Sequence, residues 1–520
     1  LGGRDGLGGL SRGSIGPADL ADEANYYIFT ALVGLGLLFF MIRLIHSPFG
    51  HVLQAIRENQ QRAGFQGYNV DRYKLVAFVI SATVTGVAGA LSGFQHYIVS
   101  ADYTSVPLSG ELMAMVVIGG MHSLLGPGIG VIFYILFREL FSIWTSNWML
   151  WFGLIFVGFV IFSPTGIVGV WNQIARRWRP VVEESSAMSR RKIYEGLPLP
   201  DFLTPPPSPA GPVLEVEGID KFFGGFHAVK SVDLAVDSGQ IHALIGPNGA
   251  GKTTTFNLIS GMFAPVRGSV RLHGQPIDGF GAARIAQAGL ARSFQITSLF
   301  EGLTIEENLR LSVQAKHAGR FNIWRDTSSY EEVNRQTAEL VRFLGLEGIE
   351  DVLGGDLSYG GQRLVDLGIA LATKPKVLLL DEPLAGLAAA ERERVVSLVK
   401  RMAINIPVLI VEHDLDRVLS LSHKVTVMNQ GAVLMSGTPA EVRCDRQVQE
   451  IYTGTGTPPV VGRSEVQQAD AALRQRAVER GRELVGLHDG LGPAAIGAGE
   501  RGEIRVVQRG ARQTCGELPP

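Results

Sequence analysis

The sequence contains few cysteines and few charged residues. Its 520 residues include two cysteines, Cys444 and Cys515, and 18% of the residues are charged. Two cysteines exclude a disulfide-rich scaffold and a cysteine-based metal site, and they suit a reducing compartment. The formal net charge of -2 gives no basis for attraction to phosphate, so we expect no nucleic-acid partner. A mean hydropathy of +0.19 is high for a soluble enzyme, which predicts a membrane part.

Basic residues are missing from one long stretch, and their distribution predicts a membrane orientation. No lysine or arginine occurs from Leu75 to Phe137, whereas several precede it closely: Arg43, Arg57, Arg62, Arg72 and Lys74. Because cytoplasmic loops are enriched in basic residues, we expect residues 47–70 inside and Asp102 outside. A second basic group returns the chain to the inside: Arg176, Arg177 and Arg179. The chain is therefore expected to cross an odd number of times between these points.

Four apolar runs predict a transmembrane domain in residues 1–180. They are Tyr26–Ile45, Leu75–Ser100, Leu112–Phe137 and Trp148–Phe162. At about 1.5 Å per residue, a helix of about 20 residues spans a hydrocarbon core of about 30 Å. A single run of this kind can be a buried core helix. Four in succession favour a multi-pass protein in contact with membrane lipid.

Glycine and proline interrupt the third run. Gly119-Gly120 and Gly126-Pro127-Gly128 divide it into two apolar pieces, each too short for a simple span. An odd number of crossings then requires a pair of short crossings or a re-entrant segment, and such backbone is tolerated only against protein or water. We therefore take this segment as the best candidate for lining a translocation route. Helix packing through small residues is the alternative.

Residues 47–70 are too polar to span a membrane. Val52, Ile56 and Asn59 or Gln60 share one helical face, which suits a membrane surface or a partner protein, with a solvated surface helix as the alternative. The runs S-P-F-G, A-I-R-E-N, G-Y-N-V and R-Y-K-L resemble the cytoplasmic coupling loop of permeases in the hydrophobic amino-acid uptake (Liv-type) family of ABC importers. The later runs M-V-V-I-G-G-M-H-S-L-L-G-P-G-I-G and S-P-T-G-I resemble the same family. The resemblance covers about residues 1–175 and only the later part of such a permease, so we expect earlier spans to be missing.

Two further regions have no core-forming pattern. Residues 181–212 contain seven prolines between Leu197 and Pro212, which favour an extended, semi-rigid tether, with an SH3-type ligand as the alternative. Residues 455–520 are rich in Gly, Ala, Arg and Glu, with one short amphipathic stretch at Val466–Leu484. We expect this tail to be disordered, and a regulatory tail is the alternative.

The stretch Ile241–Thr254 reads I-H-A-L-I-G-P-N-G-A-G-K-T-T and fits the phosphate-binding pattern G-x-x-x-x-G-K-[ST]. Its glycines let successive N–H groups face one anion, and the following helix start adds its positive dipole end. Lys252 can reach the β- and γ-phosphates, and the Thr253 hydroxyl can bind Mg²⁺. The pattern predicts an ATP-binding loop made of Gly246, Pro247, Asn248, Gly249, Ala250, Gly251, Lys252, Thr253 and Thr254.

Two apolar strands downstream end in side chains that suit phosphate chemistry. Val377–Asp381 is followed by Glu382, and V407-L-I-V-E-H413 ends in a histidine. Asp381 is expected to hold Mg²⁺ through water, and Glu382 can polarise the attacking water as general base. A structural acidic pair is the alternative for these two carboxylates. His413 can contact the γ-phosphate.

Two residues outside these strands complete the predicted nucleotide site. Gln295, in the run R-S-F-Q, can complete the shell of Mg²⁺ or water and can sense the membrane domain. Phe223 lies upstream of the phosphate loop and can stack on adenine, whereas a core phenylalanine is the alternative.

The set G-P-N-G-A-G-K-T-T, Q, L-S-Y-G-G-Q, L-L-L-D-E-P and H resembles the ATPase of ABC transporters. G-G-F-H-A-V, L-F-E-G-L-T-I-E-E-N-L and V-E-H-D-L-D-R-V resemble the Liv-type ATPase over about residues 213–454. The resemblance implies that two ATPase domains enclose two nucleotides, with Ser358, Gly360 and Gly361 of one reaching the γ-phosphate of the other. A second ATPase is therefore required. Ala388 stands where the family usually has Asn or Asp, which implies altered communication across the dimer or a weaker site.

Together these features predict an α-helical transmembrane domain joined to an α/β P-loop ATPase of the ABC type. We expect domains at residues 1–180, 181–212, 213–454 and 455–520. The predicted function is an ATP-hydrolysing importer component for branched-chain amino acids or related small solutes, using ATP and Mg²⁺. The expected partners are a second permease subunit, a second ATPase subunit and an extracytoplasmic solute-binding protein. We expect an inner (plasma) membrane location with a cytoplasmic ATPase. An exporter half-molecule and a membrane-tethered ATPase that moves no solute are the alternatives.

Overall fold

The computed structural model describes residues 6–100, 105–177, 199–204, 211–294, 299–413 and 415–453. Predictions about Asp102, Arg179, Gln295, most of the linker, and the tail from 455 onward lie outside these ranges. The chain divides into two compact units, Leu1–Leu434 and Met435–Pro520.

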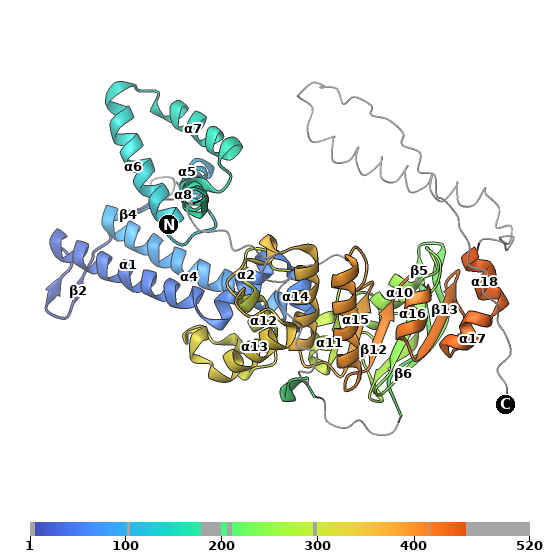
Figure 1. Ribbon diagram of the computed structural model, residues 1–520. Coiled ribbons are helices and arrows are strands. Elements are labelled where there is room, and N and C mark those ends of the chain that lie inside the picture. Colours follow the sequence, from blue (N-terminus) through green and yellow to red (C-terminus); the bar gives the residue numbers. More distant parts are fainter. Residues whose placement is uncertain are drawn as a thin grey trace, which may run out of the picture. The chain divides into compact units, whose positions relative to one another are not determined.

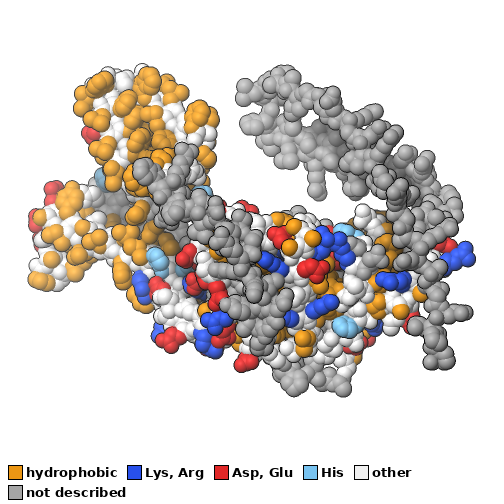
Figure 2. Space-filling model, viewed as in Figure 1, with side chains coloured by type: hydrophobic (Ala, Val, Ile, Leu, Met, Phe, Trp, Pro, Cys, Tyr) orange, Lys and Arg blue, Asp and Glu red, His pale blue; other side chains and the backbone are white. Residues whose placement is uncertain are grey.

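Long apolar helices form the N-terminal part of the first unit (Figure 1). Among the described residues, three helices are long and apolar enough to cross a membrane: α1 (Glu23–Ile45), α4 (Val70–His96) and α6 (Gly126–Trp144). A fourth candidate combines α7 (Trp148–Phe162) with the start of α8 (Gly166–Arg177) across a bend of 41°. Figure 2 shows hydrophobic side chains over these helices, and many are exposed, as expected of surfaces that face lipid. The structure thus confirms an apolar multi-helix domain.

The interruption of the third apolar run is present, but its second piece is longer than predicted. Helix α5 (Val106–Gly119) ends at the glycine pair, and α6 begins at Gly126. The prediction that both pieces are too short for a span was wrong for α6, whose 19 residues suffice. This helix continues past Arg138 and Glu139 because a charged side chain near a helix end can reach toward the polar boundary without breaking the backbone hydrogen bonds.

Glycines let α5 and α6 approach at the level of their backbones. A Cβ added to Gly130 would lie 1.8 Å from the Met115 carbonyl oxygen, and one added to Gly119 would lie 1.8 Å from the Gly126 oxygen. No side chain fits such a contact, so these positions require glycine. The glycine-rich interruption therefore permits close helix packing, as the alternative predicted, and the lining role stays a prediction.

We expect Gly130→Ala to lower the melting temperature of the membrane part by about 5 °C, because overpacking against backbone forces the two helices apart. Tryptophan fluorescence in detergent measures this directly, since five of the chain's six tryptophans lie in residues 1–180. Gly128→Ala is the matched control: it lies on the same helix, and an added Cβ there meets nothing within 4 Å. Equal losses in both variants would contradict the packing account.

Short strands lie at the ends of the helical part. β1 (Leu7–Gly8) pairs antiparallel with β4 (Ile98–Val99), and β2 (Ser14–Ile15) pairs with β3 (Ala18–Asp19). Between them, the Arg12 guanidinium lies over the Tyr26 and Tyr97 rings at 4.1 and 4.3 Å. The glycine-rich opening of the chain is thus tied to the far end of α4.

Two β-sheets form the ATPase part. An antiparallel sheet has the order β6-β5-β8-β9, formed by Phe226–Asp237, Pro212–Phe223, Arg267–Leu272 and Gln275–Pro276. A second sheet has the order β10-β11-β12-β7-β13-β14, formed by Leu290–Arg292, Val377–Asp381, Val408–Val411, Ile241–Ile245, Lys424–Asn429 and Ala432–Gly437. The pairs from β10 to β13 are parallel. β7, β11 and β12 are buried at every residue, as their continuous apolar sequences require.

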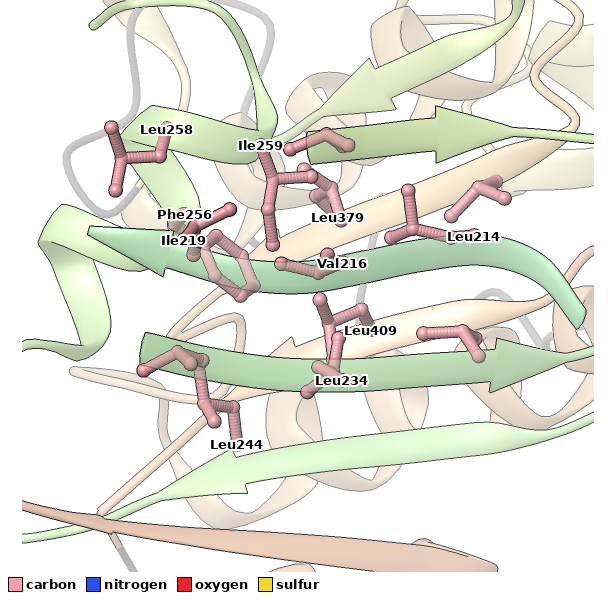
Figure 3. Close-up of a cluster of buried hydrophobic side chains, with 14 of the residues drawn as sticks. Leu214, Val216, Ile219, Leu234, Leu244, Phe256, Leu258, Ile259, Leu379 and Leu409 are labelled. Atoms are coloured by element: carbon pink, nitrogen blue, oxygen red, sulfur yellow. The ribbon is translucent and has the colours of Figure 1, made fainter. Parts of the chain in front are cut away.

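The main core lies between these two sheets. Figure 3 shows Val216 and Leu234 of the antiparallel sheet, Leu379 and Leu409 of the parallel sheet, and Phe256 of α10 (Lys252–Ile259) in one packed layer. All five side chains are buried. This layer anchors the loop that precedes α10 to the strands on either side.

Helices complete the ATPase. α12 (Ile305–Gln314), α13 (Glu331–Leu344) and α14 (Tyr359–Ala372) pack against one another. A capping box between Thr304 and Glu307 fixes the start of α12. Further helices and 3-10 turns between residues 199 and 434 are α11 (Ala282–Ala288), α15 (Ala389–Ala403), α16 (Leu415–Leu421), η3 (Asp201–Leu203), η4 (Ala318–Phe321), η5 (Thr327–Ser329) and η6 (Gly354–Asp356). The second unit contains α17 (Pro439–Cys444) and α18 (Arg446–Thr453).

Residues 47–70, here termed the coupling segment, form two short helices. α2 (Pro48–Glu58) buries Val52 and Ile56, as the helical face predicted. Asn59 does not continue that helix, because its backbone is extended and its side chain caps α3 (Gln60–Phe65). The buried face packs on the ATPase part of the same chain, against Phe300, Leu303, Leu311 and Ala315. A membrane surface or a separate partner was expected, so the observed contact corrects that expectation.

Candidate functional site

The predicted phosphate and carboxylate motifs meet at one edge of the parallel sheet. β7, β12 and β11 are neighbouring parallel strands, so their carboxyl ends lie side by side. The phosphate loop follows β7, Asp381 is the last residue of β11 with Glu382 directly after it, and His413 follows β12. The topology thus brings together motifs that are distributed over residues 246–413 of the sequence.

The phosphate loop has the backbone that its glycines predicted. Gly246, Gly249 and Gly251 have φ angles of 153°, 81° and 96°, and Gly251 is the N-cap of α10. A Cβ on Gly246 would lie 2.2 Å from the Met428 carbonyl oxygen, so a larger residue is excluded there. Pro247, Asn248 and Ala250 complete the loop. Its N–H groups and the start of α10 have the arrangement that can bind an anion.

The Lys252 side chain bonds back to the phosphate loop. Its Nζ donates to the carbonyl oxygens of Gly246 at 2.7 Å and Pro247 at 3.0 Å, and the side chain is buried. Burial lowers the pKa of Lys252, and the nearby carboxylates of Glu382 and Asp381 oppose that shift. The ammonium group is therefore held against the loop, and the two acidic side chains favour its charged form, which could neutralise a phosphate.

Asp381 is buried and paired with an arginine. Its Oδ2 lies 3.0 Å from Nη2 of Arg292, and Arg292 also donates to Asn257 at 2.6 Å and Ser260 at 2.8 Å. Burial lowers the pKa of Arg292, and Asp381 opposes that shift. No role was predicted for Arg292. Its role depends on β10 lying beside β11, which the local sequence does not indicate.

Glu382 and His413 form a pair at the same edge. His413 Nδ1 lies 3.2 Å from Glu382 Oε1, and the two side chains are 52% and 13% exposed. Glu382 has a φ of 47°, which is unusual for glutamate and typical of strained functional sites. Glu412 was not predicted: it is buried, it accepts from the Leu384 N–H at 3.0 Å, and burial raises its pKa. Glu412 therefore holds the turn after Glu382.

The remaining predicted residues lie apart from this edge or outside the described ranges. Ser358 caps α14 and accepts from the Gly361 N–H at 3.2 Å, next to Gly360. Ser358 itself is exposed, and its contact with a second ATPase remains a prediction. Phe223 is 45% exposed at the end of β5, in edge contact with Phe263 at 5.5 Å, so it is not a core phenylalanine. Gln295 lies outside the described residues.

Ala388 occupies the N-cap of α15. Its N–H donates to the Glu391 carboxylate at 3.2 Å, but its methyl group offers no acceptor in return. An Asn or Asp at this position would supply that acceptor. The departure from the family pattern therefore removes a helix cap as well as a polar surface group.

The donor set fits Mg²⁺ and a nucleotide. Thr253 and Thr254 lie in the first turn of α10, where Thr253 is exposed, and Asp381 lies at the neighbouring strand end. Within the described residues, no three His, Cys, Asp or Glu side chains gather in a way that could hold a metal. Mg²⁺ commonly uses one or two protein oxygens with substrate phosphates and water, so a hydroxyl and a single carboxylate are sufficient.

Family models match three parts of the chain. Residues 10–163 match the branched-chain amino acid transport system permease component, and residues 229–385 match the ABC transporter ATPase. Residues 432–457 match the branched-chain amino acid ATP-binding cassette transporter model. The first match lies in the apolar helices, and the second includes the phosphate loop and Asp381.

Curated relatives cover the ATPase part. The high-affinity branched-chain amino acid transport ATP-binding protein BraF of Pseudomonas aeruginosa is 38% identical over 251 residues, which is 47% of this chain and 98% of BraF. The high-affinity branched-chain amino acid transport ATP-binding protein LivG of Escherichia coli K12 is 36% identical over 251 residues, which is 47% of this chain and 98% of LivG. A crystal structure of a nucleotide-free ATP-binding cassette from an ABC transporter is 32% identical, with a TM-score of 0.42, covering 46% of this chain and 99% of that one.

These matches confirm the predicted architecture and activity. The P-loop domain is an ATP-binding and ATP-hydrolysing cassette, and the apolar helices make the chain a membrane protein. The chain belongs to the branched-chain amino acid transport family of ABC transporters and carries a permease component and an ATPase in one polypeptide.

Proposed function

We propose that the chain imports branched-chain amino acids or related small solutes, using ATP hydrolysed by its own cassette. The observation that carries this proposal is the direct packing of the coupling segment on the ATPase of the same chain. Tyr68 of this segment donates to the Leu311 carbonyl at 2.6 Å, and Gln314 donates to the Pro48 carbonyl at 3.2 Å. Tyr73, on the following helix α4, donates to the Arg320 carbonyl at 2.9 Å. BraF and LivG are branched-chain amino acid transport ATP-binding proteins, which supports this solute class.

The site residues have separate proposed roles. The loop from Gly246 to Thr254 holds the phosphates, with Lys252 on the β- and γ-phosphates. Thr253 and Asp381 would hold Mg²⁺, which neutralises phosphate charge when bound. Glu382 takes the proton of the attacking water.

The residues around this centre orient the reaction. His413 holds Glu382 and contacts the γ-phosphate, and Gln295 completes the shell of the metal or the water. Phe223 offers an exposed ring on which adenine can stack. All of these assignments are proposals that rest on position and residue type.

A complete transporter requires further subunits. One set of ATPase motifs per chain implies a second ATPase, whose phosphate loop would meet the exposed Ser358 with Gly360 and Gly361. The permease part implies a second permease subunit and an extracytoplasmic solute-binding protein. The basic residues of the coupling segment support a cytoplasmic ATPase at the inner (plasma) membrane.

The packing supports a simple transport cycle. ATP binding closes the ATPase pair and moves the coupling segment, because the two pack without an intervening solvent layer at Val52 and Phe300. This movement changes access through the permease, and hydrolysis resets both parts.

We expect the solute-loaded binding protein to stimulate ATP hydrolysis several-fold when the solute is leucine, isoleucine or valine. The measurement is phosphate release by the chain reconstituted in nanodiscs with its neighbouring permease, ATPase and binding-protein subunits. Urea and short amides serve as comparison solutes in the same assay. Stimulation by urea or amides alone would reassign the solute class, and hydrolysis that responds to none of them would contradict the importer proposal.

A further inference from the structure

An arginine of the coupling segment is buried in the contact between this segment and the ATPase part. Nη2 of Arg62, on α3, lies 2.6 Å from Oδ1 of Asp366, on α14, and the two side chains are 1% and 0% exposed. The Arg62 guanidinium also lies 5.4 Å from the centre of the Phe294 ring. A charge that is removed from water requires a partner of opposite charge. Arg62 and Asp366 supply this partner to each other only while the coupling segment packs against the ATPase part.

The ion pair continues toward the catalytic carboxylates. Oδ2 of Asp366 lies 3.9 Å from Nη1 of Arg363, one turn earlier on α14. Arg363 is completely buried, and its guanidinium donates to the carbonyl oxygens of Asp381 at 2.9 Å and Pro383 at 3.2 Å, and to that of Glu382. A buried sequence of charges thus extends from the permease part to the backbone on both sides of Glu382.

The backbone at Glu382 depends on such contacts. Its φ of 47° is costly for a residue with a side chain and persists only where neighbouring groups fix it. Arg363 binds the carbonyl of this residue and those of both its neighbours. A shift of Arg363 would therefore alter the direction of the Glu382 side chain.

A second contact runs beside the first. Phe65 of α3 meets the Phe294 ring edge-on at 4.9 Å, and the Arg292 guanidinium, which pairs with Asp381, lies 5.3 Å from the same ring. A void of about 10 Å³ lies among Arg62, Phe65, Arg292 and their neighbours. This is about the space of one water molecule, so movement of α3 displaces these side chains instead of filling free space.

We propose that Arg62, Asp366 and Arg363 are positioning residues through which the coupling segment sets the alignment of Glu382. This inference rests on the proposed transport function and deepens it. When the coupling segment is seated, the ion pair holds Arg363 against the catalytic turn. When it moves, Asp366 loses its partner and Arg363 shifts, so hydrolysis responds to the state of the permease.

The test compares solute-stimulated with basal ATP hydrolysis in nanodiscs containing the full transporter. The double variant Arg62→Met with Asp366→Asn removes one positive and one negative charge, so the net buried charge is unchanged and the packing is kept. We expect stimulation to fall to about the basal rate while the KM for ATP stays within about twofold, because only the coupling changes. Arg62→Lys should retain part of the stimulation. Arg57→Gln, which changes an exposed arginine of the same segment, should behave as the wild type.

Each outcome decides the proposal. Wild-type stimulation in the double variant, or equal loss in Arg57→Gln, would overturn it. If the double variant does not assemble, Arg62→Lys decides, since it keeps the charge but loses the planar fork. Unchanged stimulation in Arg62→Lys would overturn the proposal, and a loss of stimulation of roughly two- to threefold would support it. A wild-type transporter that no solute stimulates would instead contradict the proposed function.

Discussion

Glu382→Gln is expected to lower ATP hydrolysis by about 10²- to 10⁴-fold, which is the usual contribution of a general base. The amide keeps the shape of the side chain but cannot take a proton from water. The contact with His413 at 3.2 Å and the φ of 47° do not depend on the carboxylate charge alone, so the fold of the turn should survive. ATP should therefore still bind. Phosphate release and ATP binding, measured on the same preparation, check both parts.

The control for this variant is Glu393→Gln, which changes an exposed carboxylate on α15 and should leave hydrolysis unchanged. If Glu382→Gln hydrolysed ATP at the wild-type rate, the assignment of the general base would be wrong. Loss of binding as well as hydrolysis would point instead to a structural role for the acidic pair.

The second large effect is expected from Lys252→Ala, which should weaken ATP binding as well as lower hydrolysis. The Lys252 ammonium bonds to two loop carbonyls and lies beside Asp381 and Glu382. Without it, the loop loses these bonds and the two carboxylates repel the phosphates. A charged hydrogen bond is worth about 1.5–3 kcal/mol, so affinity should fall by about 10- to 100-fold.

Fluorescent-nucleotide titration measures this affinity. Lys400→Ala, on the exposed face of α15, is the matched control and should bind ATP as the wild type does. Wild-type affinity in Lys252→Ala would show that the lysine is not at the phosphates. The contrast with Glu382→Gln is itself informative, because Lys252→Ala should weaken ATP binding by about 10- to 100-fold and Glu382→Gln should preserve it.

Local patterns were sufficient to predict the elements that carry the site. The strand before the phosphate loop, the strand ending at Asp381 and the helix after Ser358 all have apolar patterns bounded by recognisable polar ends. The glycines of the loop predicted its backbone because only glycine adopts such φ angles readily.

Contacts between distant segments could not be predicted in this way. Arg62 and Asp366 are 304 positions apart, and nothing in either local run indicates the other. The same holds for the pair of Arg292 and Asp381. Asp366 does interrupt an apolar helix face, which marks it as a buried charge in need of a partner. The identity of that partner depends on how the coupling segment docks, which only the fold shows.

The most direct test of the central claim is ATP-driven uptake of labelled leucine by membrane vesicles of known orientation. The vesicles contain the chain with its neighbouring permease, ATPase and binding-protein subunits, and Lys252→Ala is assayed in parallel. The account predicts uptake that requires ATP and is lost in the variant. ATP hydrolysis without leucine, isoleucine or valine uptake, or ATP-driven movement in the outward direction, would contradict it.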